Sequence, residues 1–132
     1  MMKKFKFASV AALLVCSILL FTGCSSFGAI KKAFEGAEYK YSQNVSASYS
    51  YLTDEAEEMG ISVTMHSFTK GLNLAIVIEF GSTKDLLQYV AESEELKTLI
   101  KDLNETDFVN MNCVLVPVGL NPSEMIELFK NA

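Results

Sequence analysis

Residues 61–80, with the sequence ISVTMHSFTKGLNLAIVIEF, decide the fold. The first part alternates between apolar and polar side chains, as in a strand with one exposed face. Its apolar positions are Ile61, Val63 and Met65, and its polar positions are Ser62, Thr64 and His66. The run Leu72–Phe80 is apolar on both faces, as in a central strand, and Thr69-Lys70-Gly71 between the two runs has turn composition. The stretch predicts a β-hairpin.

The region before this hairpin predicts one more strand and two short helices. Residues 44–52 alternate between serine and tyrosine or aliphatic side chains, which is typical of a half-exposed strand. Residues 53–60 predict one or two helical turns, with Thr53 as N-cap and Gly60 as C-cap. Residues 29–39 carry apolar side chains at spacings of three and four, which predicts a short amphipathic helix.

The region after the hairpin predicts helix, strand and helix. Ser82 is suited to cap a helix that runs to about residue 103. Residues 107–118 form a second strongly apolar run, and the long connection favours a right-handed crossover to a strand parallel to residues 72–80. Asn121 and Pro122 predict the start of the last helix, with Leu120 packing onto Met125 as a hydrophobic staple.

These elements predict an α+β fold with a sheet of about four strands, mixed in direction, and the two later helices packed on one face. A signal peptide and a short N-terminal helix precede the sheet. The expected boundaries are a signal peptide at residues 1–23, a tether and short helix at residues 24–43, and a single domain at residues 44–132.

The N-terminus has the pattern of an export signal. Lysines at positions 3, 4 and 6 precede the largely apolar residues 7–21, and Phe21-Thr22-Gly23-Cys24 closes that run. This stretch resembles the lipobox of bacterial prolipoproteins, and the resemblance is confined to the first 24 or so residues. It implies cleavage between Gly23 and Cys24 by a type II signal peptidase and a diacylglyceryl thioether on Cys24. The new amine would take a fatty acid such as palmitate.

The resemblance therefore implies a lipoprotein of the cell envelope, bound to the membrane through the lipid on Cys24. In a Gram-negative cell, Ser25 after the cysteine favours the outer membrane. The alternatives are plain secretion and an uncleaved transmembrane helix. Fifteen apolar residues rise about 22 Å as a helix, which is short of a hydrocarbon core of roughly 30 Å.

Removal of the leader changes the composition. The mature chain would have 109 residues, enough for one domain. Three of the 11 lysines leave with the leader while all 16 acidic residues stay, so the net charge falls from −5 to −8. Such a charge argues against nucleic acid as a partner, and against electrostatic binding to anionic lipid head groups. The chain has no arginine and so no bidentate clamp for phosphate.

The titratable residues suggest no catalytic residue, metal or cofactor. His66 is the single histidine, and its strand parity predicts a solvated surface position. Cys113, the one cysteine outside the leader and the lipid site, is predicted to lie in the core, on one strand face with Val109, Met111 and Leu115. The carboxylates at positions 54, 55, 57 and 58 lack calcium-loop spacing and indicate a solvated helical turn.

Four residues are candidates for a ligand or partner surface: Tyr49, Tyr51, Glu79 and Ser82. Tyr39 and Tyr41 extend the tyrosine-rich region, which predicts either an aromatic contact patch or packing of the first strand. Glu79 is expected at a strand end near Lys84, with any pocket lying between Glu79, Ser82 and Val118-Gly119.

The function that these features favour is a membrane-anchored, non-enzymatic binding or scaffold module with an envelope protein partner. Two alternatives stay open. One is a small enzyme that depends on the Cys113 thiol or on carboxylates. The other is an immunity- or inhibitor-type lipoprotein, for which the charge of −8 would suit a basic target.

Overall fold

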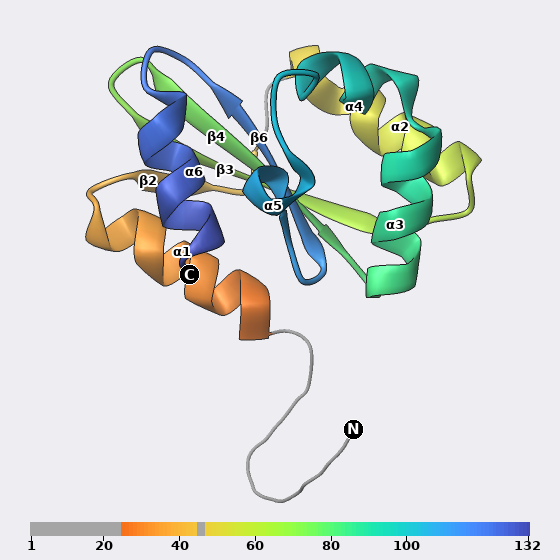
Figure 1. Ribbon diagram of the computed structural model, residues 1–132, viewed down its shortest axis with the longest axis horizontal. Coiled ribbons are helices and arrows are strands. Elements are labelled where there is room, and N and C mark those ends of the chain that lie inside the picture. Colours follow the sequence, from red (N-terminus) through yellow and green to blue (C-terminus); the bar gives the residue numbers. More distant parts are fainter. Residues whose placement is uncertain (1–24, 45–46) are drawn as a thin grey trace, which may run out of the picture.

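The computed structural model describes residues 25–44 and 47–132, which form a five-stranded antiparallel sheet with helices on both faces (Figure 1). The strand order is β2-β3-β4-β6-β5. The strands are β2 Lys40–Ser42, β3 Val63–Lys70, β4 Asn73–Phe80, β5 Val109–Asn110 and β6 Cys113–Val118. The helices are α1 Ser25–Gly36, α2 Ser50–Glu58, α3 Thr83–Glu92, α4 Glu94–Leu99, α5 Glu105–Phe108 and α6 Pro122–Lys130. The α+β class is confirmed, with one strand more than expected.

The predicted hairpin is confirmed and lies at the centre of the sheet. β3 and β4 pair in antiparallel register from Val63↔Phe80 to Lys70↔Asn73. Gly71 occupies the turn with a φ of 60°, a conformation that costs glycine little. Both faces of β4 are buried, as its unbroken apolar composition predicts.

Helices cover both faces of the sheet, so the prediction of helices on one face is wrong. α2, α3 and α4 pack on one face, and α1 and α6 pack on the other, giving three layers (Figure 1). The first core contains Leu52, Ala56, Ile76, Ile78, Phe80, Leu86, Tyr89, Leu96, Val114 and Val116. The second contains Ile30, Phe34, Phe68, Ala75, Val77, Cys113, Leu115, Met125 and Phe129. Because β4 and β6 are buried on both sides, each supplies alternate residues to the two cores.

The predicted parallel strand at residues 107–118 is wrong in both length and direction. A turn at Met111–Asn112 divides this run into β5 and β6, and β6 runs antiparallel to β4. Met111 adopts a φ of 55°, which a non-glycine residue rarely does, so the turn composition of its neighbours Asn110 and Asn112 was not enough to predict a break in the apolar run. The apolar run therefore looked like one strand, although it is a short hairpin preceded by α5.

The predicted strand at residues 44–52 is also wrong. Of its described residues, Ala47–Tyr49 form a 3₁₀ turn, and α2 begins at Ser50 rather than after Thr53. Leu52 and Ala56 lie one helical turn apart and are both buried, so helical packing overrides the alternation. Gly60 follows the helix with a φ of 78°, close to its predicted place.

The predicted helix from Ser82 to about residue 103 is interrupted at Ser93. Ser82 caps α3 as expected, because its hydroxyl accepts a hydrogen bond from the Asp85 amide at 3.1 Å. Ser93 then ends α3 and caps α4, accepting from the Leu96 amide at 3.0 Å. The Ser93 hydroxyl also donates to Glu55 Oε1 at 2.5 Å, which ties this corner to α2.

The last helix begins as predicted, and its staple does not form. The Asn121 side chain accepts from the Glu124 amide at 3.2 Å, and Pro122 occupies the first turn. Leu120 is 80% exposed and therefore does not pack onto Met125, which is fully buried.

The described residues of the expected tether and short helix at 24–43 belong to the fold, and the helix expected at residues 29–39 is observed as α1. Ile30 and Phe34 of α1 are fully buried, and β2 pairs with β3 in register from Lys40↔Thr69 to Ser42↔Ser67. α1 and β2 therefore pack together with residues 44–132, which were expected to form the domain alone.

Ionisation of Tyr89 should lower stability at high pH. Burial chiefly raises the pKa of Tyr89 to about 12, and its hydroxyl donates to the Leu52 carbonyl at 3.2 Å. Because the pKa of Tyr89 is higher in the folded than in the unfolded protein, its contribution to the free energy of unfolding is fully present below pH 10, the ordinary pKa. That contribution is lost as the pH rises towards 12. We expect urea unfolding to show this decline, and a shallower decline for Tyr89→Phe. Equal declines in the two proteins would contradict the assignment.

Candidate functional site

His66 is the centre of a buried polar cluster, which corrects its predicted solvated position. The imidazole is 3% exposed and lies on the sheet face that α1 covers. Its Nε2 lies 2.9 Å from Glu79 Oε1, and its Nδ1 lies 2.7 Å from the Tyr41 hydroxyl oxygen. A neutral ring that carries its proton on Nε2 donates to the carboxylate and accepts from the tyrosine, so both nitrogens are satisfied.

The first turns of α1 close over this cluster. The Phe27 ring stacks on the imidazole with 3.7 Å between ring centroids and 18° between planes. One turn further along α1, the Lys31 ammonium lies 4.9 Å from the centroid of the Tyr41 ring. Residues from α1, β2, β3 and β4 thus meet at one histidine, and we name Phe27, Tyr41, His66 and Glu79 the His66 cluster.

Strand register explains how distant residues meet in the His66 cluster. Thr64 pairs with Glu79 and His66 pairs with Val77, so alternate residues of β3 and β4 share a face. Glu79 therefore reaches His66 diagonally, rather than Lys84 as predicted. Phe68 has the same parity as His66 and is fully buried. An apolar residue at position 68 was therefore the sign in the sequence that this face of β3 is covered rather than exposed to solvent.

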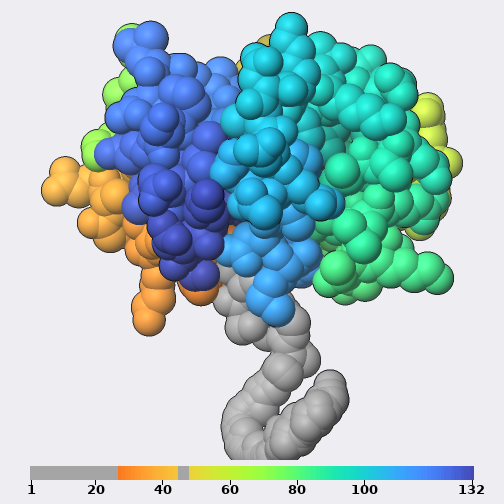
Figure 2. All heavy atoms as spheres, in the orientation of Figure 1, coloured from red at the N-terminus to blue at the C-terminus, as the bar shows by residue number. Residues whose placement is uncertain are grey.

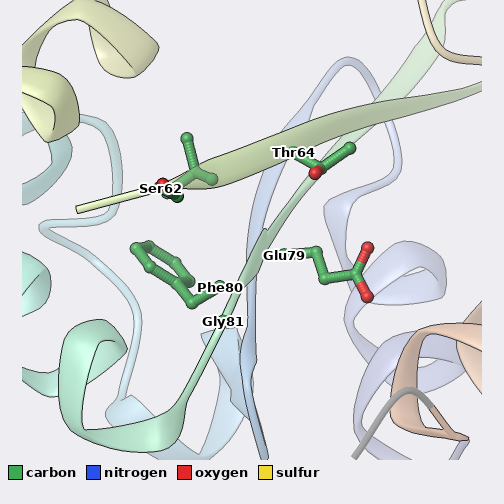
Figure 3. A pocket seen from close by; sticks show the side chains of 6 residues that line it. Ser62, Thr64, Glu79, Phe80 and Gly81 are labelled. Carbon is green, nitrogen blue, oxygen red and sulfur yellow. The ribbon is translucent and has the colours of Figure 1, made fainter.

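A small hollow adjoins the His66 cluster where β3 begins and β4 ends (Figure 3). It has a volume of about 240 Å³ and is lined by Ser62, Val63, Thr64, Glu79, Phe80 and Gly81. Figure 3 shows the Glu79 and Phe80 side chains on opposite sides of β4, with the carboxylate below Thr64. The polar side chains in this hollow are two hydroxyls and one carboxylate that already holds His66. Its chemistry suits a small hydrogen-bond donor.

A second hollow lies between α2 and α4, in the other helical layer. It has a volume of about 350 Å³ and is lined by Tyr51, Asp54, Glu55, Glu58 and Glu95. Burial, followed by the charge of Glu95, raises the pKa of the Tyr51 phenol. We call this surface the acidic hollow. Within the described part of the chain, no group of three or more His, Cys, Asp and Glu is placed to hold a metal ion.

The four predicted surface residues do not form one surface. Tyr49 and Tyr51 pack against the core between the sheet and α2–α4, and only Tyr51 lines the acidic hollow. Glu79 belongs to the His66 cluster on the opposite face, and Ser82 caps α3. Val118 pairs with Leu74 while Glu79 pairs with Cys113, so Gly119 and Glu79 lie at opposite ends of the sheet. The predicted pocket between them is therefore absent from the described residues.

The remaining tyrosines also divide between packing roles. Tyr39 is buried beside Phe34, and its hydroxyl donates to Glu124 Oε1 at 2.6 Å. Burial and this hydrogen bond raise the pKa of Tyr39 to about 12. Tyr39 and Tyr41 lie in the α1–α6 layer, whereas Tyr49 and Tyr51 lie in the other. The four tyrosines therefore make no continuous patch.

The Cys113 thiol should resist modification in the folded protein. As predicted, Cys113 is fully buried, and it packs in one core with Leu115, whereas Met111 is exposed and Val109 packs against the other core. A thiol without solvent access reacts slowly, whatever its intrinsic reactivity. We expect a maleimide to leave Cys113 unmodified under native conditions and to label it in urea. Rapid native labelling would revive a thiol-dependent activity.

The predicted signal peptide and the predicted lipid site at Cys24 lie outside the described residues. Within the described residues, no helix combines the length and apolar character needed to cross a membrane. No family model matches the chain, and searches of curated proteins and of solved structures find no match.

Proposed function

We propose that this protein is a lipid-anchored module of the bacterial cell envelope that acts by binding a partner rather than by catalysis. The lipobox pattern at Phe21–Cys24 supplies the anchor. The observation that carries the proposal is the start of α1 at Ser25, the residue after the proposed lipid site. Because Ile30 and Phe34 of α1 pack into the core, a lipid on Cys24 would hold the domain close to the membrane.

The rigid attachment suits a scaffold or binding role. Two or more acyl chains hold a protein stably at a membrane. Ile30 and Phe34 fix α1 against the sheet, and Phe27 fixes it against His66. An anchored copy would therefore present its remaining surfaces close to the membrane, which favours capture of a partner in the same membrane or envelope layer.

Replacement of the proposed lipid-bearing cysteine tests the anchor. Cys24→Ser removes the sulfur that would carry the diacylglyceryl group, and we expect the protein to leave the membrane fraction after a high-salt wash. Cys16→Ser, within the apolar leader, is the matched control and should fractionate like the wild type. Equal membrane retention of Cys24→Ser and wild type would contradict a lipid anchor.

Crosslinking tests the binding role. Wild-type protein crosslinked in intact envelopes should yield a discrete adduct that Cys24→Ser loses, because the partner would be met at the membrane. Absence of any adduct across crosslinkers of different length and chemistry would count against a binding module.

The acidic hollow favours the inhibitor- or immunity-type role as the second candidate. Its four carboxylates come from two helices and surround a half-buried tyrosine, which is the surface that a basic target would need. The charge-removing variant Asp54→Asn/Glu58→Gln/Glu95→Gln should abolish a salt-dependent interaction while leaving Glu55 bonded to Ser93. If the variant forms the crosslinked adduct to the same extent as the wild type, this role for the acidic hollow is excluded.

A further inference from the structure

One end of the sheet gathers three parts of the chain that are distant in sequence. At this end β3 begins, β4 finishes at Phe80 and β6 begins at Cys113. The turn between β5 and β6 is fastened there, because the Asn112 side chain donates to the Phe80 carbonyl at 2.7 Å. α3 starts immediately after, with Ser82 as its cap. The stack of Phe27 on His66 brings the first turn of α1 to the same end.

We call this surface the Phe80 end: the start of α1, the β5–β6 turn and the start of α3. All three lie along the lower side of the molecule in Figure 1, and Figure 2 shows the molecule as spheres in the same orientation. The opposite end carries the β3–β4 turn and the loop before α6. Leu72 and Leu120 there are 77% and 80% exposed.

The position of the anchor decides which end meets the membrane. α1 begins at Ser25, and a helix rises about 1.5 Å per residue, so lipid on Cys24 would lie within a few ångströms of the first turn of α1. No flexible linker separates this turn from the sheet, since Phe27 stacks on His66 and Ile30 is fully buried. With so short a connection, the end of the domain that carries the start of α1 would lie nearer the bilayer than the opposite end.

The surface chemistry of the two sides agrees with this orientation. At the Phe80 end, Met111 is 64% exposed at the tip of the β5–β6 turn, and Lys84 is exposed in the first turn of α3. An exposed thioether can enter the boundary between head groups and acyl chains, and a lysine at a helix N-terminus favours lipid phosphates. Asp85 also lies in the first turn of α3, where its backbone amide donates a hydrogen bond to the Ser82 hydroxyl.

The strongly acidic surface lies elsewhere. The acidic hollow is built on α2 and α4, which occupy the upper side of Figure 1, away from the start of α1. These four carboxylates would therefore project away from the membrane, while Asp107, close to the β5–β6 hairpin, is paired with Lys130.

On these grounds, and resting on the proposed lipidation of Cys24, we propose that the Phe80 end lies flat against the lipid bilayer. Met111 reaches the boundary between head groups and acyl chains, and Lys84 contacts lipid phosphates. Leu72, Leu120 and the acidic hollow then face away from the membrane, where they are open to a partner.

Depth-dependent quenching tests this orientation. The full lipidated protein is placed in vesicles of phosphatidylethanolamine and phosphatidylglycerol, with a bimane fluorophore on Met111→Cys or Leu72→Cys. The two positions are a matched pair, since each is an exposed apolar residue in a tight turn between strands. Nitroxide lipids should quench position 111 several-fold more than position 72. Lys84→Cys gives a second reporter at the Phe80 end and should behave like position 111.

The outcomes separate the orientation from the anchor. Equal quenching at positions 111 and 72, or stronger quenching at 72, in protein whose mass includes the lipid would overturn the orientation alone. Protein that carries no lipid on Cys24 when made in its native envelope would overturn both the anchor and the orientation that rests on it.

Discussion

Gly119→Ala should lower the free energy of unfolding by about 2–4 kcal/mol, because the new methyl group would collide with backbone that cannot move. A Cβ at this position would lie 2.5 Å from the Leu72 carbonyl oxygen and 2.9 Å from the Asn73 Cα. Gly119 also has a φ of 133°, which side-chain-bearing residues rarely adopt. The Asn121 amide donates to the Asn73 side chain at 3.0 Å, so the two loops are already joined there.

Gly81→Ala is the matched control. A Cβ at Gly81 would meet nothing within 4 Å, and its φ is not in the left-handed region. We expect its stability to stay within about 0.5 kcal/mol of the wild type. Both variants are measured by urea unfolding of the unlipidated chain that starts at residue 24, with Cys24→Ser. Equal midpoints for Gly119→Ala and wild type would show that the two loops are not packed as described.

His66→Ala should cost about 3 kcal/mol of stability, since it removes a buried ring together with two hydrogen bonds. It leaves the Glu79 carboxylate and the Tyr41 hydroxyl without their shared partner, and Phe27 without the ring on which it stacks. The rate of amide hydrogen exchange should rise more in α1 and β2 than in α3, because the lost contacts hold α1 and β2 to the sheet.

A double-mutant cycle separates the stack from general loss of packing. Phe27→Ala and His66→Ala should couple by about 1 kcal/mol, as expected for an aromatic pair in contact. Tyr41→Phe removes only one hydrogen bond and should cost about 1 kcal/mol. Ser62→Ala, an exposed substitution on the same strand face, serves as the control. Additive effects of Phe27→Ala and His66→Ala would contradict the stacked arrangement.

The elements that were predicted correctly from the sequence have local signals. The β3–β4 hairpin follows from an alternating run, a glycine turn and an apolar run. The starts of α3 and α6 follow from the capping side chains of Ser82 and Asn121. These features depend on residues within a few positions of one another, so a single sequence contains enough information to predict them.

The elements that were predicted wrongly depend on distant contacts. The serine–tyrosine alternation of residues 44–52 has the period of a strand, yet Leu52 and Ala56 find apolar partners only when the segment is helical. The turn at Met111 uses a backbone conformation that methionine rarely adopts, and the apolar run outweighed the turn signal of Asn110 and Asn112. Without that turn, the direction of β6 was read in reverse.

The candidate site was only partly visible for the same reason. The strand parity of His66 was correct, and the wrong step was to assume that solvent covers that face. Its cover is the first turns of α1, about 39 residues earlier in the chain at Phe27, and this helix was predicted to lie outside the domain. Glu79 was predicted as a site residue at a strand end near Lys84, whereas its observed partner is His66.

The intact mass of the mature protein, extracted from its native envelope, tests the central claim most directly. We predict a chain that begins at Cys24, ends at Ala132 and carries a diacylglyceryl group on the cysteine sulfur. A fatty acid on the new amine would add one further acyl mass. A chain that begins at Met1, or at any residue other than Cys24, and carries no lipid would contradict the anchored-module account.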